Sequence, residues 1–160
     1  MNTQQDTKPL RIWQQNVAKS LTAQHDLLSR AHSKDWDIIA LQEPYIDHLN
    51  LTRAGQSWNV IYPSNKGLNG QAHIRSIILV NTNIHSEQIS QIGIQSSDIT
   101  AIQFNTNTRP VIIINVYNDN THSRAIDTIS RAWETHKNTW LANPNTEIVV
   151  LGDFNRHHST

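Results

Sequence analysis

Cysteine is absent from the 160-residue chain, and the N-terminus carries no long apolar segment. Without cysteine the protein forms neither disulfides nor zinc sites with thiolate ligands. Without an apolar segment the N-terminus resembles neither a signal peptide nor a membrane span. These absences predict a soluble intracellular protein, and the polar residues 1–9 predict a disordered head.

Charge is also scarce. Lys and Arg together number 13, as do Asp and Glu, so the formal net charge is zero and charged residues make up 16% of the chain. Such a balance excludes a broad basic surface for nucleic acid, so binding to DNA would need a local patch, a metal ion or further sequence. The length fits one domain with its own core.

Apolar residues follow two of the patterns that mark strands. The segment LRIWQQN (10–16) alternates apolar and polar residues, as in a half-buried strand. In contrast, DIIAL (37–41) is almost continuously apolar, as in a strand covered on both faces. Further strands are predicted at residues 58–62, 74–80, 99–104, 111–117 and 147–151.

Two helices are predicted between these strands. Ser20 is a suitable N-cap for a helix over residues 21–36. Over residues 123–142, apolar side chains recur every three or four positions, which predicts an amphipathic helix with Trp133 and Trp140 on its inner face. The order of elements predicts a layered α/β domain with a mixed sheet.

Polar side chains follow four of the predicted strands at the point where each strand ends. They are Asn16, Glu43, the group Tyr117, Asn118 and Asp119, and the pair Asp153 and Asn155. Because ligands of layered α/β folds collect outside strand ends, we expect these side chains to converge. Taken singly, each residue is more often a turn former or a rim residue, so the prediction depends on the joint pattern.

The residue types in this set suit one reaction. A Glu and an Asp supply the hard oxygen ligands that Mg²⁺ takes together with water and substrate phosphate. Asparagine amides donate to phosphate oxygens without adding charge, and a tyrosine hydroxyl can donate to an oxyanion. The set therefore favours metal-assisted hydrolysis of a phosphodiester.

Four segments resemble, in this order, the endonuclease/exonuclease/phosphatase family, which includes deoxyribonuclease I, apurinic endonucleases, inositol phosphatases and the endonuclease domains of non-LTR retrotransposons. They are QQNVAKS (14–20), DIIALQEPYI (37–46), VIIINVYND (111–119) and IVVLGDFNRHHS (148–159). LQE and GDFN together carry the likeness, and NVYND with GDFN-Arg-His-His is most similar to the retrotransposon branch. The resemblance implies a four-layer α/β sandwich of the deoxyribonuclease I type.

The resemblance also implies that residues 10–160 are only the N-terminal part of the family domain. Such a fragment would lack later strands of the second sheet and a closing Ser-Asp-His segment whose histidine faces the scissile phosphate. Because losing a transition-state contact of this kind costs about 10² to 10⁴ in rate, the chain is expected to be weak or inactive alone.

Carried over onto matching positions, the resemblance makes Glu43 the principal metal ligand and Asn16 its partner. Asp153 would orient or activate the attacking water. Asn155 would bind the scissile phosphate, and Tyr117 would donate to it as negative charge builds.

Further contacts with the substrate are expected from Asn118, Arg156, His157 and His158. For the two histidines, a role as acid, base or metal ligand stays open beside this one.

The interpretation that follows is a Mg²⁺-dependent DNA endonuclease of the retrotransposon type, with Mn²⁺ as an alternative ion. DNA would be bound through its backbone, a reverse transcriptase domain would follow in the intact protein, and the location would be nuclear. Two alternatives remain: a phosphoesterase acting on a small molecule such as an inositol phosphate, and a non-catalytic remnant that serves as a metal-binding interaction module.

Overall fold

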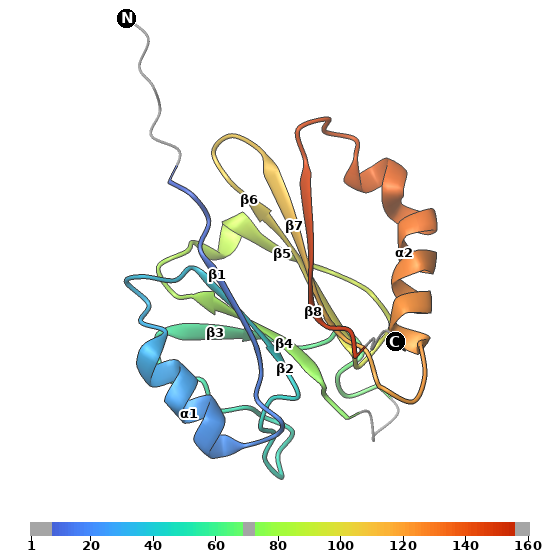
Figure 1. Cartoon of the computed structure of the whole chain (residues 1–160). Helices are drawn as coiled ribbons and strands as arrows, with labels where there is room; N and C mark the ends of the chain where they lie inside the picture. Colours follow the sequence, from blue (N-terminus) through green and yellow to red (C-terminus); the bar gives the residue numbers. More distant parts are fainter. Residues whose placement is uncertain (1–7, 69–72, 156–160) are drawn as a thin grey trace, which may run out of the picture.

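The computed structural model of the chain describes residues 8–68 and 73–155, and within them two four-stranded sheets pack face to face (Figure 1). The first sheet has the strand order β1-β2-β4-β3 and the second β5-β6-β7-β8. The strands are β1 (Ile12–Asn16), β2 (Ile38–Gln42), β3 (Trp58–Ile61), β4 (Ser76–Asn81), β5 (Ile89–Ile92), β6 (Ile99–Asn105), β7 (Pro110–Tyr117) and β8 (Glu147–Asp153). β1 is parallel to β2 and β7 to β8, whereas the other neighbours are antiparallel.

Two helices, α1 (Leu21–Arg30) and α2 (Arg124–Trp140), lie on opposite sides of the paired sheets (Figure 1). One apolar cluster joins α1 to the first sheet, a second joins α2 to the second sheet, and a third fills the space between the sheets. Members of the three clusters are, respectively, Leu27, Ile39 and Leu79; Ala125, Ile112 and Trp140; and Ile38, Ile78 and Ile113. This arrangement confirms the four-layer α/β sandwich.

Strand β7 shows why a continuous apolar run forms the centre of the second sheet. Ile112 and Ile114 belong to the cluster beneath α2, while Val111 and Ile113 belong to the cluster between the sheets. Because successive side chains of a strand point to opposite faces, both faces of β7 require apolar residues.

The first helix begins as predicted but ends earlier. The Ser20 hydroxyl accepts a hydrogen bond from the backbone nitrogen of Ala23, as an N-cap should. The helix ends at Arg30 instead of continuing to residue 36. Beyond it, the carbonyls of Ser33 and Trp36 accept hydrogen bonds from the side-chain amide of Asn81 on β4. Tertiary hydrogen bonds therefore replace helical ones in this segment.

Two other predictions need correction. Trp140 is buried on the inner face of α2, but Trp133 is 36% exposed, and Ala125, Ile129 and Ala132 fill the covered face. Strand β5, which follows the short 3₁₀ helix η1 (Ser86–Gln88), was not expected. Its four residues carry two exposed polar side chains in the middle, too short a pattern to mark a strand.

No helix within residues 8–68 or 73–155 has the length and apolar character needed to cross a membrane. The predicted disordered head lies outside the described residues, apart from Lys8 and Pro9.

Candidate metal and phosphate site

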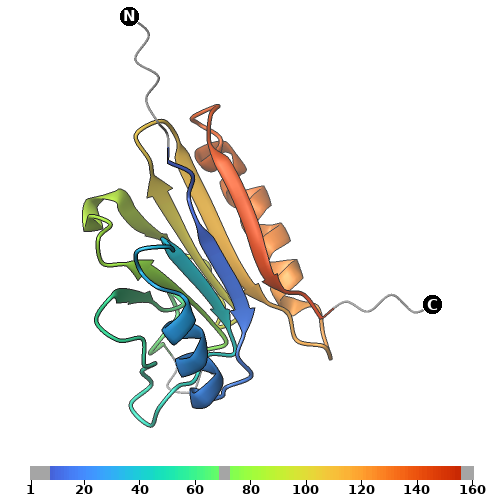
Figure 2. The same cartoon turned by 60° about the vertical axis from the view of Figure 1, so that its left-hand side comes forward.

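The predicted strand ends meet at one end of the molecule. β1 and β8 are neighbours across the two sheets and run in the same direction, so their final residues emerge together (Figure 2). The inward-facing residues alternate along each strand: Ile12, Gln14 and Asn16 on β1, Ile113, Asn115 and Tyr117 on β7, and Val149, Leu151 and Asp153 on β8. Asn16, Tyr117 and Asp153 are thus the last inward positions of their strands, and Glu43 follows directly after β2.

Asn16 connects the two acidic residues of the site. Its side-chain nitrogen donates to Glu43 Oε2 at 3.1 Å and to Asp153 Oδ2 at 2.9 Å. Its side-chain oxygen accepts a hydrogen bond from the backbone nitrogen of Ala18 at 2.8 Å, which fixes the orientation of the amide. The Glu43 and Asp153 oxygens therefore lie within two hydrogen-bond lengths of each other, although the residues are far apart in sequence.

Glu43 has a backbone conformation that is unusual for its residue type. Its φ is 46°, in the left-handed region that L-residues other than glycine rarely adopt. Two hydrogen bonds hold it there: its nitrogen donates to the Arg75 carbonyl at 2.8 Å, and its carbonyl accepts from Lys19 nitrogen at 2.7 Å. Strain of about 1–3 kcal/mol persists only where surrounding structure imposes it, and it concentrates at functional sites.

Asp153 reaches the site because Gly152 lacks a side chain. Gly152 has a φ of 144°, and a Cβ at this position would lie 1.9 Å from the carbonyl oxygen of Val116 on β7. After Gly152, the Asp153 carboxylate accepts a hydrogen bond from Asn155 nitrogen at 3.1 Å, and the Asp153 carbonyl accepts one from Asn118 nitrogen at 2.8 Å. The sequence GDFN therefore forms a sharp turn at the end of β8, in which the Asn155 nitrogen fixes the Asp153 carboxylate.

Asn155 and Asn118 link the loops that follow β8 and β7. The side-chain nitrogen of Asn155 donates to the Asn118 carbonyl at 2.7 Å, and Asn155 itself is left-handed with a φ of 44°. Asn118 is only 2% exposed, and its side-chain nitrogen donates to the Phe154 carbonyl at 2.9 Å. This bond ties the Asn118 side chain to the loop after β8, and its contact with substrate stays a prediction.

Tyr117 lies at the end of β7 and is 9% exposed. Burial raises the pKa of its hydroxyl, and the negative charges of Glu43, Asp119 and Asp153 raise it further. The hydroxyl is therefore protonated at neutral pH and can donate a hydrogen bond.

Asp119, which the sequence singles out, belongs to a charged cluster beside Tyr117 whose other members, Arg75 and Asp98, the sequence does not indicate as part of the site. The Arg75 guanidinium lies over the tyrosine ring, with 5.2 Å from Cζ to the ring centroid. It donates to both carboxylate oxygens of Asp98, at 2.6 and 3.1 Å, and to Asp119 at 2.9 Å. The only signal in the sequence is a lone charge beside each apolar strand, which is too common to be informative.

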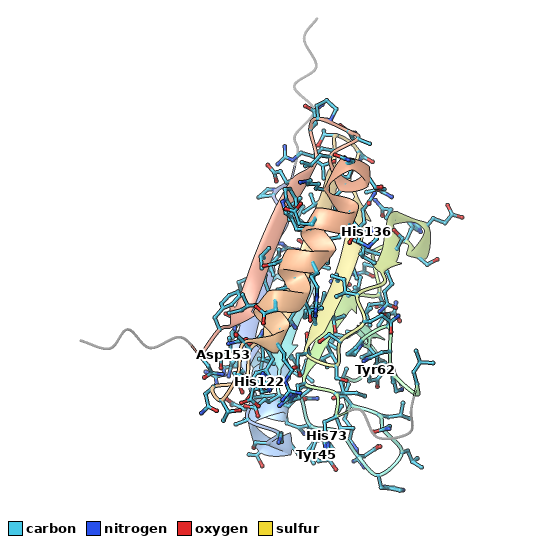
Figure 3. All side chains as sticks on the ribbon, turned by 90° about the vertical axis from the view of Figure 1, so that its right-hand side faces the viewer. Tyr45, Tyr62, His73, His122, His136 and Asp153 are labelled. Carbon is cyan, nitrogen blue, oxygen red and sulfur yellow. The ribbon has the colours of Figure 1, made fainter. Side chains whose placement is uncertain are left out.

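The negative charge of Asp119 is strongly stabilised. A hydrogen bond from the Thr121 hydroxyl, another from the Thr121 backbone nitrogen, and the neighbouring Arg75 lower its pKa to about 2. His122, from the same loop, has its Nε2 3.8 Å from the Asp119 carboxylate. In Figure 3, His122 and Asp153 appear at the end of the molecule where α2 begins.

Three of the residues expected to contact substrate, Arg156, His157 and His158, lie outside the described residues. Among the described ones, Asn16, Glu43 and Asp153 are brought into direct contact, and Asn155 and Tyr117 lie beside them.

The donor set fits a hard divalent cation. The carboxylates of Glu43 and Asp153 converge on the side-chain nitrogen of Asn16, whereas no group of three His, Cys, Asp or Glu side chains forms a metal site in the described part of the chain. Mg²⁺ takes one or two carboxylates and completes its octahedron with water and phosphate oxygens. Glu43 would bind such an ion, and Asn16 would hold Glu43 and Asp153 in place around it.

The model of the endonuclease/exonuclease/phosphatase family matches residues 8–160. The chain belongs to this family. No curated protein matches it significantly.

Solved structures share the fold at low identity. The endonuclease domain of TRAS1, a telomere-specific non-LTR retrotransposon, is 18% identical with a TM-score of 0.68, and the match covers 93% of this chain and 60% of that one. For D. rerio TDP2 complexed with single strand DNA product, the identity is 13% and the TM-score 0.59, over 92% and 61% of the two chains. For a beta toxin of Staphylococcus aureus, the values are 14% and 0.52, over 95% and 68%. The chain thus spans about 60% of the length of the TRAS1 domain.

Proposed function

We propose that the site hydrolyses phosphodiesters of DNA with the help of Mg²⁺, with Mn²⁺ as an alternative ion. The observation that carries the proposal is the single amide nitrogen of Asn16, which donates to both Glu43 and Asp153. It brings two acidic residues from different sheets to one point at the strand ends, where layered α/β folds bind ligands.

Each residue has a separate task in this reaction. Asp153 accepts the proton of a water molecule whose oxygen attacks phosphorus, and the bond from phosphorus to the leaving oxygen breaks. The Asn155 side chain binds a non-bridging phosphate oxygen. The protonated Tyr117 hydroxyl donates to the same group as negative charge accumulates. A divalent cation held by Glu43 would supply charge neutralisation at the phosphate.

DNA is the proposed substrate because one neighbour of this fold is described as the endonuclease domain of a retrotransposon and another as a TDP2 complexed with a single strand DNA product. The retrotransposon origin extends the proposal to a reverse transcriptase domain in the intact protein and a nuclear location. Sequencing the native transcript beyond the codon for Thr160 tests that extension directly.

The test is nicking of supercoiled plasmid by the purified chain with Mg²⁺, Mn²⁺ or EDTA. We expect metal-dependent nicking that Glu43→Gln and Asp153→Asn each reduce by about 10²-fold or more. Glu87→Gln and Asp35→Asn are the matched controls, because both residues are exposed and should leave the rate unchanged. Nicking that persists in Glu43→Gln would refute the proposal.

One observation favours a second candidate, a metal-binding module without turnover. The chain spans about 60% of the TRAS1 endonuclease domain, so activity that needs the remainder would be absent here. In that case Mg²⁺ would raise the melting temperature of the wild type and not of Glu43→Gln, while neither plasmid nor an inositol phosphate would be hydrolysed. Hydrolysis of the inositol phosphate alone would instead indicate a small-molecule phosphoesterase.

A further inference from the structure

The layer between the two sheets changes character toward the site. Far from the site it is apolar and is filled by Ile38, Ile78, Val80, Ile102, Val111 and Ile113. Next to the site the same layer is polar and contains Gln14, Gln42, Ser76, Thr100 and Asn115. Four of these five are no more than 1% exposed: Gln42, Ser76, Thr100 and Asn115.

A buried polar layer needs a reason, because apolar residues of the same shape would pack there without a desolvation cost. Here every member is hydrogen-bonded. Asn115, on the second sheet, donates to the carbonyls of Leu41 and Ile77 on the first sheet at 2.9 and 2.8 Å. Its side-chain oxygen accepts from Gln42 Nε2 at 2.6 Å. One asparagine thus binds three groups on the opposite sheet.

The remaining bonds extend this link. Gln42 Oε1 accepts from Gln14 Nε2 at 2.6 Å, which joins β2 to β1. Ser76 Oγ donates to the Asn115 carbonyl at 2.9 Å, and Thr100 Oγ1 donates to the Ser76 carbonyl at 2.8 Å. Hydrogen bonds are directional, so this layer fixes how far one sheet slides against the other, which apolar contacts alone do less strictly.

The two central amides sit directly below the site. Gln42 immediately precedes Glu43, and Asn115 is two positions before Tyr117 on the same face of β7. The acidic residues of the site come one from each sheet, since Glu43 follows β2 and Asp153 ends β8. Their distance therefore depends on the relative placement of the sheets.

We propose that Gln42 and Asn115 are positioning residues that lock the two sheets in the register at which Asn16 bridges Glu43 and Asp153. The expected effect on the rate rests on the proposed function, whereas the expected effect on the Asn16 bridge does not. Displacing catalytic groups by a fraction of a bond length lowers rates by about 10-fold to 100-fold.

The experiment replaces both amides at once with apolar residues of similar size, as Gln42→Met with Asn115→Leu. Removing both amides leaves neither of them unpaired, whereas the Leu41 and Ile77 carbonyls and the Gln14 amide each lose one hydrogen bond, so unfolding should stay cooperative at a lower midpoint. The matched control is Ile78→Leu with Ile113→Leu, which repacks the same layer at the apolar end.

Two readouts are taken on the full chain. The first is the NMR signal of the Asn16 side-chain amide, assigned with Asn16→Ala, whose shift and slow exchange report the bridge. The second is the rate of plasmid nicking with Mg²⁺. We expect the amide-free variant to lose the Asn16 signature and about 10-fold to 100-fold in rate, and the control to keep both.

An unchanged Asn16 signature in the amide-free variant overturns the proposal. If the wild type shows the signature but does not nick DNA, loss of the signature still supports the positioning role, and only the proposed function fails. If the amide-free variant does not fold, two other variants are compared. One is the single variant Gln42→Asn, and the other is the exchanged pair, which combines Gln42→Asn and Asn115→Gln. The exchanged pair should recover the signature that the single change loses, and failure to do so also overturns the proposal.

Discussion

Glu43 and Asp153 accept hydrogen bonds from one and the same atom, the side-chain nitrogen of Asn16. Glu43 follows a strand of the first sheet, and Asp153 ends a strand of the second. The amide lies between the two acidic groups and leaves Glu43 Oε1 available to a cation, whereas Asp153 Oδ1 accepts a hydrogen bond from Asn155 nitrogen.

Asn16→Ala should weaken the site without unfolding the protein. The substitution removes the shared donor, so the two carboxylates repel each other and separate. We expect nicking to fall by about 10-fold to 100-fold, and the Mg²⁺ concentration for half-maximal rate to rise. Asn138→Ala, on the exposed face of α2, is the control. An unaltered metal dependence in Asn16→Ala would show that the bridge has no functional role.

Gly152→Ala should destabilise the fold. The added Cβ would meet the Val116 carbonyl oxygen at 1.9 Å, and the φ of 144° is unfavourable for any residue with a side chain. The expected loss is at least about 2 kcal/mol in the free energy of unfolding, measured by urea denaturation. Gly93→Ala serves as the control, since its Cβ would have nothing within 4 Å. Equal midpoints for the two variants would contradict the prediction.

Tyr117→Phe should affect catalysis and not stability. The ring that packs under Arg75 is kept, and only the hydroxyl is lost. Removing a donor to developing negative charge costs about 10² to 10³ in rate, which single-turnover nicking would measure. Tyr62→Phe should lower stability and leave the nicking rate unchanged, because the Tyr62 hydroxyl accepts a hydrogen bond from Thr52 nitrogen and Tyr62 is not among the residues of the proposed site. A wild-type rate in Tyr117→Phe would remove tyrosine from the mechanism.

Because of Asp119, the free energy of unfolding should depend on pH in the acidic range. Its folded-state pKa is about 2, below the value of about 3.9 in an unfolded chain. The stabilisation that Asp119 adds to the free energy of unfolding is therefore fully present above pH 4 and is lost as pH falls from about 4 through 2. NMR titration of the Asp119 carboxyl carbon should show this low midpoint, and Thr121→Val should move it upward by removing the hydroxyl. A midpoint near 4 in the wild type would exclude the hydrogen-bonded loop.

The sequence predicts the strands well because their signal is local. Burial on both faces makes β2 and β7 continuous apolar runs, and the helix start at Ser20 is set by one capping side chain. The polar residues at the strand ends follow from the same pattern, so the sequence predicts that Asn16, Glu43 and Asp153 converge, which their hydrogen bonds confirm, while their roles stay predictions.

Features that depend on distant partners are not predictable in this way. The segment after α1 is held by Asn81, which is 45 residues away from Trp36 in the sequence, and β5 forms because β6 offers a partner edge. Arg75 pairs with Asp98 and Asp119 from two other loops, and Asn118 turns out to be enclosed by Phe154 and Asn155. Trp133 shares the helical spacing of Trp140 yet is 36% exposed, with its ring centroid 6.3 Å from that of Trp140, because Ala125, Ile129 and Ala132 cover the sheet beneath α2.

The left-handed backbone of Glu43 is strained because glutamate carries a side chain. Asn155 has the same left-handed φ but is a residue type that adopts it readily, whereas glutamate is not. Glycine at position 43 would relieve this strain and stabilise the fold by about 1 kcal/mol. A library selected only for resistance to proteolysis would therefore enrich Glu43→Gly, and one selected for DNA cleavage would eliminate it. At position 43, selection for stability would thus favour glycine, and selection for the proposed reaction would favour glutamate.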